Sequence, residues 1–166
     1  MPGARILLVE DDDILRDLLT RNLTVREHEV SIAKDAQTAL AYLRATPFDL
    51  IILDINLPDQ TGWEILRTAL REGWLHPQNI DGDGQKLPVI VLSAVRVGPG
   101  RLAEFHPLAY LPKPFPMDAL LRLSAEAAQR RATDLSGQGE KDQSSPLAMY
   151  CEHITIVVQN AFITLS

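Results

Sequence analysis

Residues 50–58 read LIILDINLP, and this stretch decides the fold. Its first four residues, Leu50 to Leu53, are all apolar, which is typical of a strand buried on both faces in a parallel sheet. The run ends on Asp54, and a carboxylate there is costly to desolvate unless hydrogen bonds, a cation or a chemical task compensate for it. The sequence therefore predicts a buried strand that holds a satisfied or functional carboxylate at its carboxyl end.

Strand-like and helix-like segments alternate on both sides of this stretch. Apolar runs predict strands at 5–9, 28–33, 50–53, 87–92 and 109–111. The first helix carries Ile14, Leu15, Leu18, Leu19 and Leu23 on one face, and the others are expected after Asp35, over 63–71, briefly over 101–105, and over 116–131. Five βα repeats predict an α/β fold with a doubly wound parallel sheet, covered by helices on both faces.

The chain of 166 residues suits one compact domain with an appendage. We expect the folded domain over 4–131 and a linker over 132–146, where the chain is polar and rich in Ser, Gly and Gln. An apolar, β-prone extension follows over 147–166. It could fold onto the sheet, pair with another chain or be a non-native addition, and the sequence leaves these alternatives open.

A polar insertion at 74–86 precedes the fourth predicted strand. We therefore expect it at the opposite end of the sheet from Asp54, without a catalytic part. Residues 79–84 copy the first half of a calcium loop, but its twelfth position is Ile90 where such a loop needs Glu. A solvent-exposed turn is the favoured interpretation.

Charge and composition exclude several classes of protein. Lys and Arg number 16 against 22 Asp and Glu, so the net charge of -6 disfavours direct binding to nucleic acid or to anionic membranes. No apolar run reaches the roughly 20 residues of a membrane-spanning helix. Cys151 has no second cysteine to pair with, and the N-terminal residues lack a signal-peptide pattern. We expect a soluble, cytoplasmic protein.

Polar residues stand at the carboxyl ends of four predicted strands, where open parallel sheets bind their ligands. They are Glu10, Asp11 and Asp12 after the first strand, Asp54 at the third, Ser93 at the fourth and Lys113 after the fifth. Clustered carboxylates need a cation, and their oxygens suit Mg²⁺. A lysine and a hydroxyl beside such a site make sense if a phosphoryl group arrives, because Lys113 neutralises its charge and Ser93 donates a hydrogen bond.

The stretches LLVEDD (7–12), LIILDINLP (50–58), VIVLSA (89–94) and AYLPKPF (109–115) together resemble the receiver domain of two-component response regulators. The resemblance covers about residues 4–131. It implies the flavodoxin-like (βα)5 fold with strand order 2-1-3-4-5, an order that comes from the family and not from the residues themselves. It also implies dependence on Mg²⁺ and a role in signal transduction.

The resemblance assigns roles position by position. Asp54 matches the phosphoacceptor, and Glu10 and Asp11 match the acidic pair that binds Mg²⁺. Of this pair, Asp11 is the one expected to contact the metal directly. Asn56 stands where a backbone carbonyl completes the metal site. Lys113 matches the family's lysine.

Two further positions match the family's switch residues. Ser93 matches the hydroxyl residue that moves onto the phosphoryl group, and Tyr110 matches the aromatic residue that turns inward in response. Lys113-Pro114 matches a cis peptide bond. Taken alone, Tyr110 is better explained by ordinary packing. Asp54, taken alone, is equally well explained by capping of the loop that follows it.

The mechanism implied is attack of the Asp54 carboxylate on phosphorus, with Mg²⁺, Lys113 and Ser93 stabilising the transferred group. The expected partners are a sensor histidine kinase or phosphotransfer protein and an output protein of unknown identity. The chain would then be no enzyme beyond its own phosphoryl transfer and dephosphorylation. Its oligomeric state, a homodimer included, is left open.

Three rival hypotheses remain. A hydrolase or phosphotransferase of small substrates typically carries a second Asp two positions after the nucleophile, and Asn56 stands there instead. A degenerate receiver could serve as a constitutive interaction module, although the acidic pair is intact. The chain could also be the front of a larger regulator. The Gly- and Pro-rich segment 95–107 puts the usual output surface in doubt.

Overall fold

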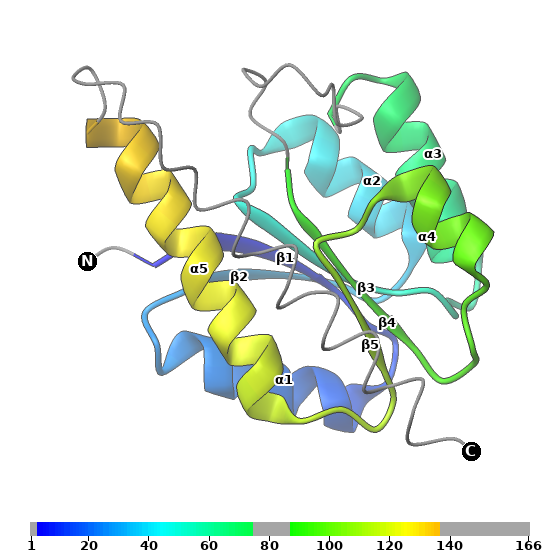
Figure 1. Cartoon of the computed structure of the whole chain (residues 1–166), viewed down its shortest axis with the longest axis horizontal. Coiled ribbons are helices and arrows are strands. Elements are labelled where there is room, and N and C mark those ends of the chain that lie inside the picture. Colours follow the sequence, from blue (N-terminus) through cyan, green and yellow to red (C-terminus); the bar gives the residue numbers. More distant parts are fainter. Residues whose placement is uncertain (1–2, 75–86, 137–166) are drawn as a thin grey trace.

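The computed structural model describes residues 3–74 and 87–136. Strands β1 to β5 span Arg5–Val9, Glu29–Ala33, Leu50–Asp54, Val89–Ser93 and Ala109–Pro112. Helices α1 to α5 span Asp13–Thr24, Ala36–Ala45, Gly62–Arg71, Pro99–Phe105 and Met117–Ser136. Strands and helices alternate along the chain, which confirms the predicted five βα repeats (Figure 1).

The five strands form one parallel sheet in the order β2-β1-β3-β4-β5. This is the order that the resemblance implies, and it confirms the flavodoxin-like α/β fold. The register pairs Val9 of β1 with Leu53 of β3, and Asp54 with Leu92 of β4. Residues that follow β1 therefore lie beside the end of β3 at the carboxyl edge of the sheet.

Two apolar cores lie on the two faces of the sheet, because successive strand residues point to opposite sides. The first core joins strand residues such as Ile6, Leu8 and Ile52 to the inner faces of α1 and α5. The second joins Leu7 and Ile51 to α2 and α3, with α4 at its margin. Figure 1 shows the same division, with α1 and α5 on one side of the sheet and α2, α3 and α4 on the other. The strands are covered on both faces, as their continuous apolar runs predict.

The face that α1 buries differs from the prediction. Leu19 and Leu23 are fully buried, but Ile14 is 82% exposed and Leu18 is 48% exposed. Five positions span too wide an arc of a helix with 3.6 residues per turn to face one sheet. Arg16, which is 5% exposed, takes the place one turn before Leu19 on the buried stripe.

Element boundaries also shift from the predictions. The third strand includes Asp54, the fourth helix begins at Pro99, and α5 continues past Arg131 to Ser136. The calcium-like half loop at 79–84 and the extension at 147–166 lie outside the described residues, so the division into domain, linker and extension stays a prediction. Within the described ranges, no helix combines the length and apolar character that crossing a bilayer requires.

Candidate functional site

The end of β1 carries two acidic residues into the site. The Glu10 backbone N–H donates to the Ala33 carbonyl (3.1 Å), so the backbone is held to β2 one residue beyond the strand. Glu10 is fully buried, whereas Asp11 is exposed. Asp12 caps α1, since its Oδ1 accepts from the Leu15 N–H (2.7 Å).

Asp54, the last residue of β3, is only 3% exposed, and two groups satisfy its charge. Its Oδ1 accepts from the Asn56 N–H at 2.9 Å. Its Oδ2 accepts from Lys113 Nζ at 2.7 Å, and the same ammonium donates to Glu10 Oε2 at 2.8 Å. Lys113 thus bridges the ends of β1 and β3 from the loop after β5, as the strand-end prediction requires.

Three carboxylates converge at this edge of the sheet. One oxygen from each of Glu10, Asp11 and Asp54 lies within 4.8 Å of the other two. Burial, together with the charge of Asp54, raises the pKa of Glu10 despite the hydrogen bond from Lys113. Burial lowers the pKa of Lys113, but its two carboxylate partners outweigh that effect and hold the pKa above its ordinary value. Burial is thus the main cause of the Glu10 shift, whereas the two carboxylates cause the Lys113 shift.

The donor set fits a hard divalent cation. All three converging ligand atoms are carboxylate oxygens, the type that Mg²⁺ prefers, and one lysine does not balance three negative charges. Asn56 follows Asp54 in the adjacent loop, and its carbonyl oxygen as a further ligand stays a prediction.

Ser93 ends β4 and is fully buried. Its Oγ donates to the Val95 carbonyl (2.8 Å) and accepts from the Val95 N–H (3.1 Å). Its own carbonyl accepts from the Lys113 N–H (2.8 Å). The backbone of Ser93 therefore lies at the site, while its hydroxyl is bound to the β4–α4 loop and not to Asp54.

Tyr110 of β5 is 5% exposed, and its hydroxyl donates to the Val95 carbonyl at 3.2 Å. Ser93 and Tyr110, the two predicted switch residues, thus meet at one carbonyl oxygen. Lys113-Pro114 is a cis peptide bond, as the resemblance implies.

Sequence reasoning missed two charged residues that support the site. Asp59 accepts from the N–H groups of Ala36 (2.9 Å) and Gln37 (3.1 Å), and so ties the β3–α3 loop to the start of α2. Slight burial raises the pKa of Asp59, but backbone N–H donors outweigh it and lower the pKa below its usual value. Asp59 lies more than twenty positions from the helix start that it contacts, and no local sequence pattern indicates such a contact.

Arg16 is the second residue that was missed. Its guanidinium donates to the carbonyls of Glu10 (3.3 Å) and Asp11 (3.2 Å), and to Asp13 Oδ1. A signal was present, because residues 16, 19 and 23 follow the i, i+3, i+7 spacing of a buried helix stripe. An arginine on such a stripe indicates a partner for its charge.

Comparison with known protein families identifies the family to which the chain belongs. The family model described as the response regulator receiver domain matches residues 6–124, most of the chain. The chain belongs to this family of two-component systems.

Two curated relatives are longer than the region that matches this chain. Response regulator MprA of Mycolicibacterium vanbaalenii is 33% identical over 139 residues, which cover 82% of this chain and 55% of the relative. Transcriptional activator protein PfeR of Pseudomonas aeruginosa is 35% identical over 148 residues, covering 81% of this chain and 45% of the relative. The chain thus spans about half the length of the curated relatives it matches.

Solved structures of response regulator proteins have the same fold as this chain. A CheY-like receiver domain protein from Methanospirillum hungatei is 28% identical with a TM-score of 0.64, and the match covers 78% of this chain and 97% of that one. Response regulator TrrA of Thermotoga maritima, solved in complex with Mg²⁺–BeF, is 25% identical with a TM-score of 0.61 over 76% of this chain and 99% of that one. Both matches extend along nearly the full length of the solved chains.

Proposed function

We propose that this receiver domain is a phosphoacceptor of a two-component phosphorelay, phosphorylated on Asp54 with Mg²⁺ bound beside it. The observation that carries the proposal is the bridge from Lys113 Nζ to both Asp54 and Glu10, at 2.7 and 2.8 Å. It puts a fixed positive charge at the carboxylate that the family motif assigns as nucleophile. The Mg²⁺–BeF complex of TrrA supports the same use of the site in a relative.

The chemistry is an in-line displacement at phosphorus. An Asp54 carboxylate oxygen forms a new bond to phosphorus while the bond to the donor breaks, and the bonding electron pair leaves with the donor group. Mg²⁺, when bound by Glu10, Asp11 and Asp54, supplies positive charge that stabilises the transferred oxygens. Lys113 exchanges its bond to Asp54 for one to the phosphoryl group. The donor is a sensor histidine kinase or a phosphotransfer protein.

The response begins at the Val95 carbonyl, on which two hydroxyls converge. When the Ser93 hydroxyl turns to the phosphoryl group, it gives up both of its hydrogen bonds to Val95. Of the two hydroxyls at the Val95 carbonyl, that of Tyr110 then remains as a donor. The changed hydrogen bonding of the β4–α4 loop biases the surface that an output protein contacts.

Intact-mass spectrometry tests the proposal. The protein is incubated with acetyl phosphate in the presence and absence of Mg²⁺, beside Asp54→Ala and an exposed control, Asp17→Asn on α1. We expect one phosphoryl adduct that requires Mg²⁺, persists in the control and is lost in Asp54→Ala. No adduct on the wild type would favour a constitutive interaction module, and an adduct that survives in Asp54→Ala would move the phosphoacceptor elsewhere.

A second candidate function is that of the receiver portion of a longer regulator. It is favoured by the limited share of each curated relative that this chain matches. The matched relatives extend well beyond the aligned region, which takes up 55% of MprA and 45% of PfeR. In that case the same switch would act on an output domain of the same polypeptide. Sequencing the gene beyond both ends of this chain decides between an output domain in the same polypeptide and a separate output protein.

A further inference from the structure

Arg16 is a buried cation that the proposed chemistry does not use. It lies in the first turns of α1 with its side chain only 6% exposed, on the stripe that faces the sheet. A guanidinium in such a place needs several acceptors to offset its desolvation. The groups that accept hydrogen bonds from the Arg16 guanidinium therefore indicate its role.

Two of its three hydrogen-bond acceptors belong to the loop that carries the acidic pair. One amino group donates to two consecutive carbonyl oxygens, those of Glu10 at 3.3 Å and Asp11 at 3.2 Å. The other amino group donates to Asp13 Oδ1. The planar guanidinium thus makes three contacts. Two of them link α1 to the β1–α1 loop, at the peptide groups of the residues whose carboxylates face Asp54, and the third lies within α1.

Holding a carbonyl fixes more than the carbonyl. The direction of a C=O group sets the plane of its peptide unit, and with it the direction in which the adjoining side chains leave the backbone. Glu10 is held independently by its N–H bond to Ala33 and its carboxylate contact with the Asp12 N–H. Asp11 is exposed and begins no regular element, so the Arg16 bond to its carbonyl is a substantial constraint on its orientation.

We propose that Arg16 is a positioning residue for the metal site: it clamps the carbonyls of Glu10 and Asp11 and so aims their carboxylates at Asp54. The inference rests on the proposed function, since it treats the acidic cluster as the Mg²⁺ site. Groups that orient metal ligands from outside the coordination sphere typically contribute a factor of roughly 10 to 100 in metal affinity.

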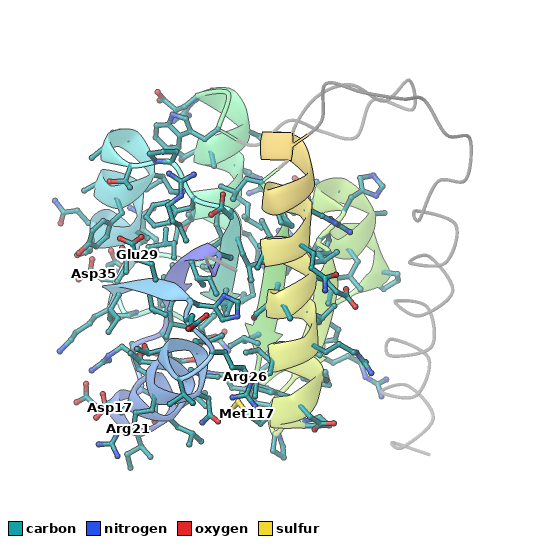
Figure 2. All side chains as sticks on the ribbon, turned by 90° about the vertical axis from the view of Figure 1, so that its left-hand side faces the viewer. Asp17, Arg21, Arg26, Glu29, Asp35 and Met117 are labelled. Atoms are coloured by element: carbon teal, nitrogen blue, oxygen red, sulfur yellow. The ribbon has the colours of Figure 1, made fainter. Side chains whose placement is uncertain are left out.

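Substitutions at Arg16 separate geometry from charge. Arg16→Lys keeps the positive charge but cannot reach two carbonyls and a carboxylate with a planar fork, and Arg16→Met keeps most of the stem without the charge. Arg21→Met is the matched control, because Figure 2 shows Arg21 pointing outward from the same helix. Asp13→Asn is a second control that removes the ion pair and leaves both carbonyl contacts.

Mg²⁺ titration by calorimetry on the folded proteins gives the first readout. We expect both Arg16 variants to bind Mg²⁺ roughly tenfold or more weakly, while Arg21→Met and Asp13→Asn bind like the wild type. If Arg16→Lys bound Mg²⁺ with wild-type affinity, the positive charge alone would account for the effect, and the positioning role would be overturned. An equal loss in Asp13→Asn would place the effect in the ion pair and would also overturn the clamp.

Amide hydrogen exchange of metal-free protein gives a readout that does not depend on Mg²⁺. We expect faster exchange at residues 10–13 in Arg16→Lys, with the strands of the sheet unchanged. Unchanged exchange in that loop would overturn the inference even if the proposed function stands. If the wild type binds no Mg²⁺, the proposed function fails, and the metal-positioning role fails with it; faster loop exchange would then show only a structural clamp. If Arg16→Met does not fold, the Mg²⁺ titration and the amide hydrogen exchange are both measured on Arg16→Lys and Arg16→Gln.

Discussion

At the residue scale, the central feature of the site is the pair of donors that bind the buried Asp54 carboxylate. Asp54 has a backbone N–H on one oxygen and the Lys113 ammonium on the other. Lys113 also serves Glu10, whose side chain is fully buried, so one cation compensates two buried anions. The arrangement leaves a negative excess that a divalent cation would relieve.

Replacing Lys113 with Met should destabilise the metal-free protein. Glu10 and Asp54 would lose their common cation while remaining buried, and breaking such a pair costs about 2 kcal/mol or more even after allowance for the partial exposure of the lysine. Because the ammonium no longer competes for the same oxygens, Mg²⁺ should stabilise the variant more than it stabilises the wild type. Urea unfolding with and without Mg²⁺ measures both effects.

Lys34→Met supplies the control for this experiment. Lys34 forms an exposed ion pair with Asp13 at 3.9 Å, and such pairs are worth less than about 1 kcal/mol. An unfolding free energy for Lys113→Met equal to that of Lys34→Met would contradict the bridging role of Lys113.

His28 predicts a pH dependence at the other end of the sheet. It is 6% exposed, and its Nδ1 accepts from the Ala4 N–H at 3.1 Å, so the folded state holds the neutral ring. Burial, and then the charge of Arg26, lower its pKa. The unfolded chain therefore binds the extra proton, and stability should fall as the pH drops below about 6.5.

Comparison with His28→Gln isolates that contribution, because a glutamine oxygen can also accept from Ala4. The raised pKa of Glu10 gives a slope of the opposite sign, but it is common to both proteins and cancels in the difference. Urea midpoints between about pH 7.5 and 5.5 should fall more steeply for the wild type than for His28→Gln. His106→Asn, at an exposed position, should follow the wild type; parallel curves for all three proteins would rule out His28.

At the element scale, the start of α3 fixes the end of β3. The Gly62 N–H donates to the Ile55 carbonyl at 2.9 Å, and Thr61 pairs across the loop with Asn56 in an isolated bridge. The Thr61 N–H also donates to Glu64 Oε2 (2.9 Å), which closes the first turn of the helix. The backbone that follows Asp54 is thus anchored directly to the helix after it.

Gly62→Ala should disturb the site without removing any functional group. A Cβ at that position would stand 2.8 Å from the Asp54 carbonyl oxygen and 3.0 Å from the Ile55 Cα, so backbone must shift. We expect a loss of about 1–3 kcal/mol in stability and slower phosphorylation by acetyl phosphate. Urea unfolding and the rate of adduct formation measure the two effects.

Gly100→Ala in α4 is the matched control, since nothing lies within 4 Å of the added Cβ. It should gain about 0.5–1 kcal/mol from helix propensity, or change little, and leave phosphorylation unaltered. If Gly62→Ala likewise left stability and phosphorylation unchanged, the close approach of α3 to β3 would not contribute to function.

Elements differed in how far the sequence predicted them. The strands were predicted well because both faces are buried, and a continuous apolar run leaves little ambiguity when helices flank it. The buried face of α1 was predicted too wide, because Ile14 and Leu18 are apolar but exposed and the buried Arg16 is charged. Hydrophobicity alone does not show which charged residue will find partners in the fold.

At the scale of the whole molecule, the topology assembles the site. Glu10, Asp54 and Lys113 are far apart in sequence, and the parallel sheet brings their strand ends to one edge because β1 and β3 are neighbours at its centre. This convergence was predictable from strand ends alone. The hydrogen bonds of the Ser93 and Tyr110 hydroxyls to Val95 were not, because the direction of a hydroxyl depends on loop conformation.

The most direct test of Asp54 as the phosphoacceptor locates the phosphoryl group chemically. After reaction with acetyl phosphate and Mg²⁺, borohydride reduces an aspartyl phosphate to the alcohol, so the modified residue exchanges one oxygen for two hydrogens and becomes homoserine. Peptide mapping by tandem mass spectrometry then reads its position. We predict homoserine at position 54 and at no other aspartate of the chain. Homoserine at another position, or none after phosphodonor treatment with Mg²⁺, would contradict phosphorylation of Asp54.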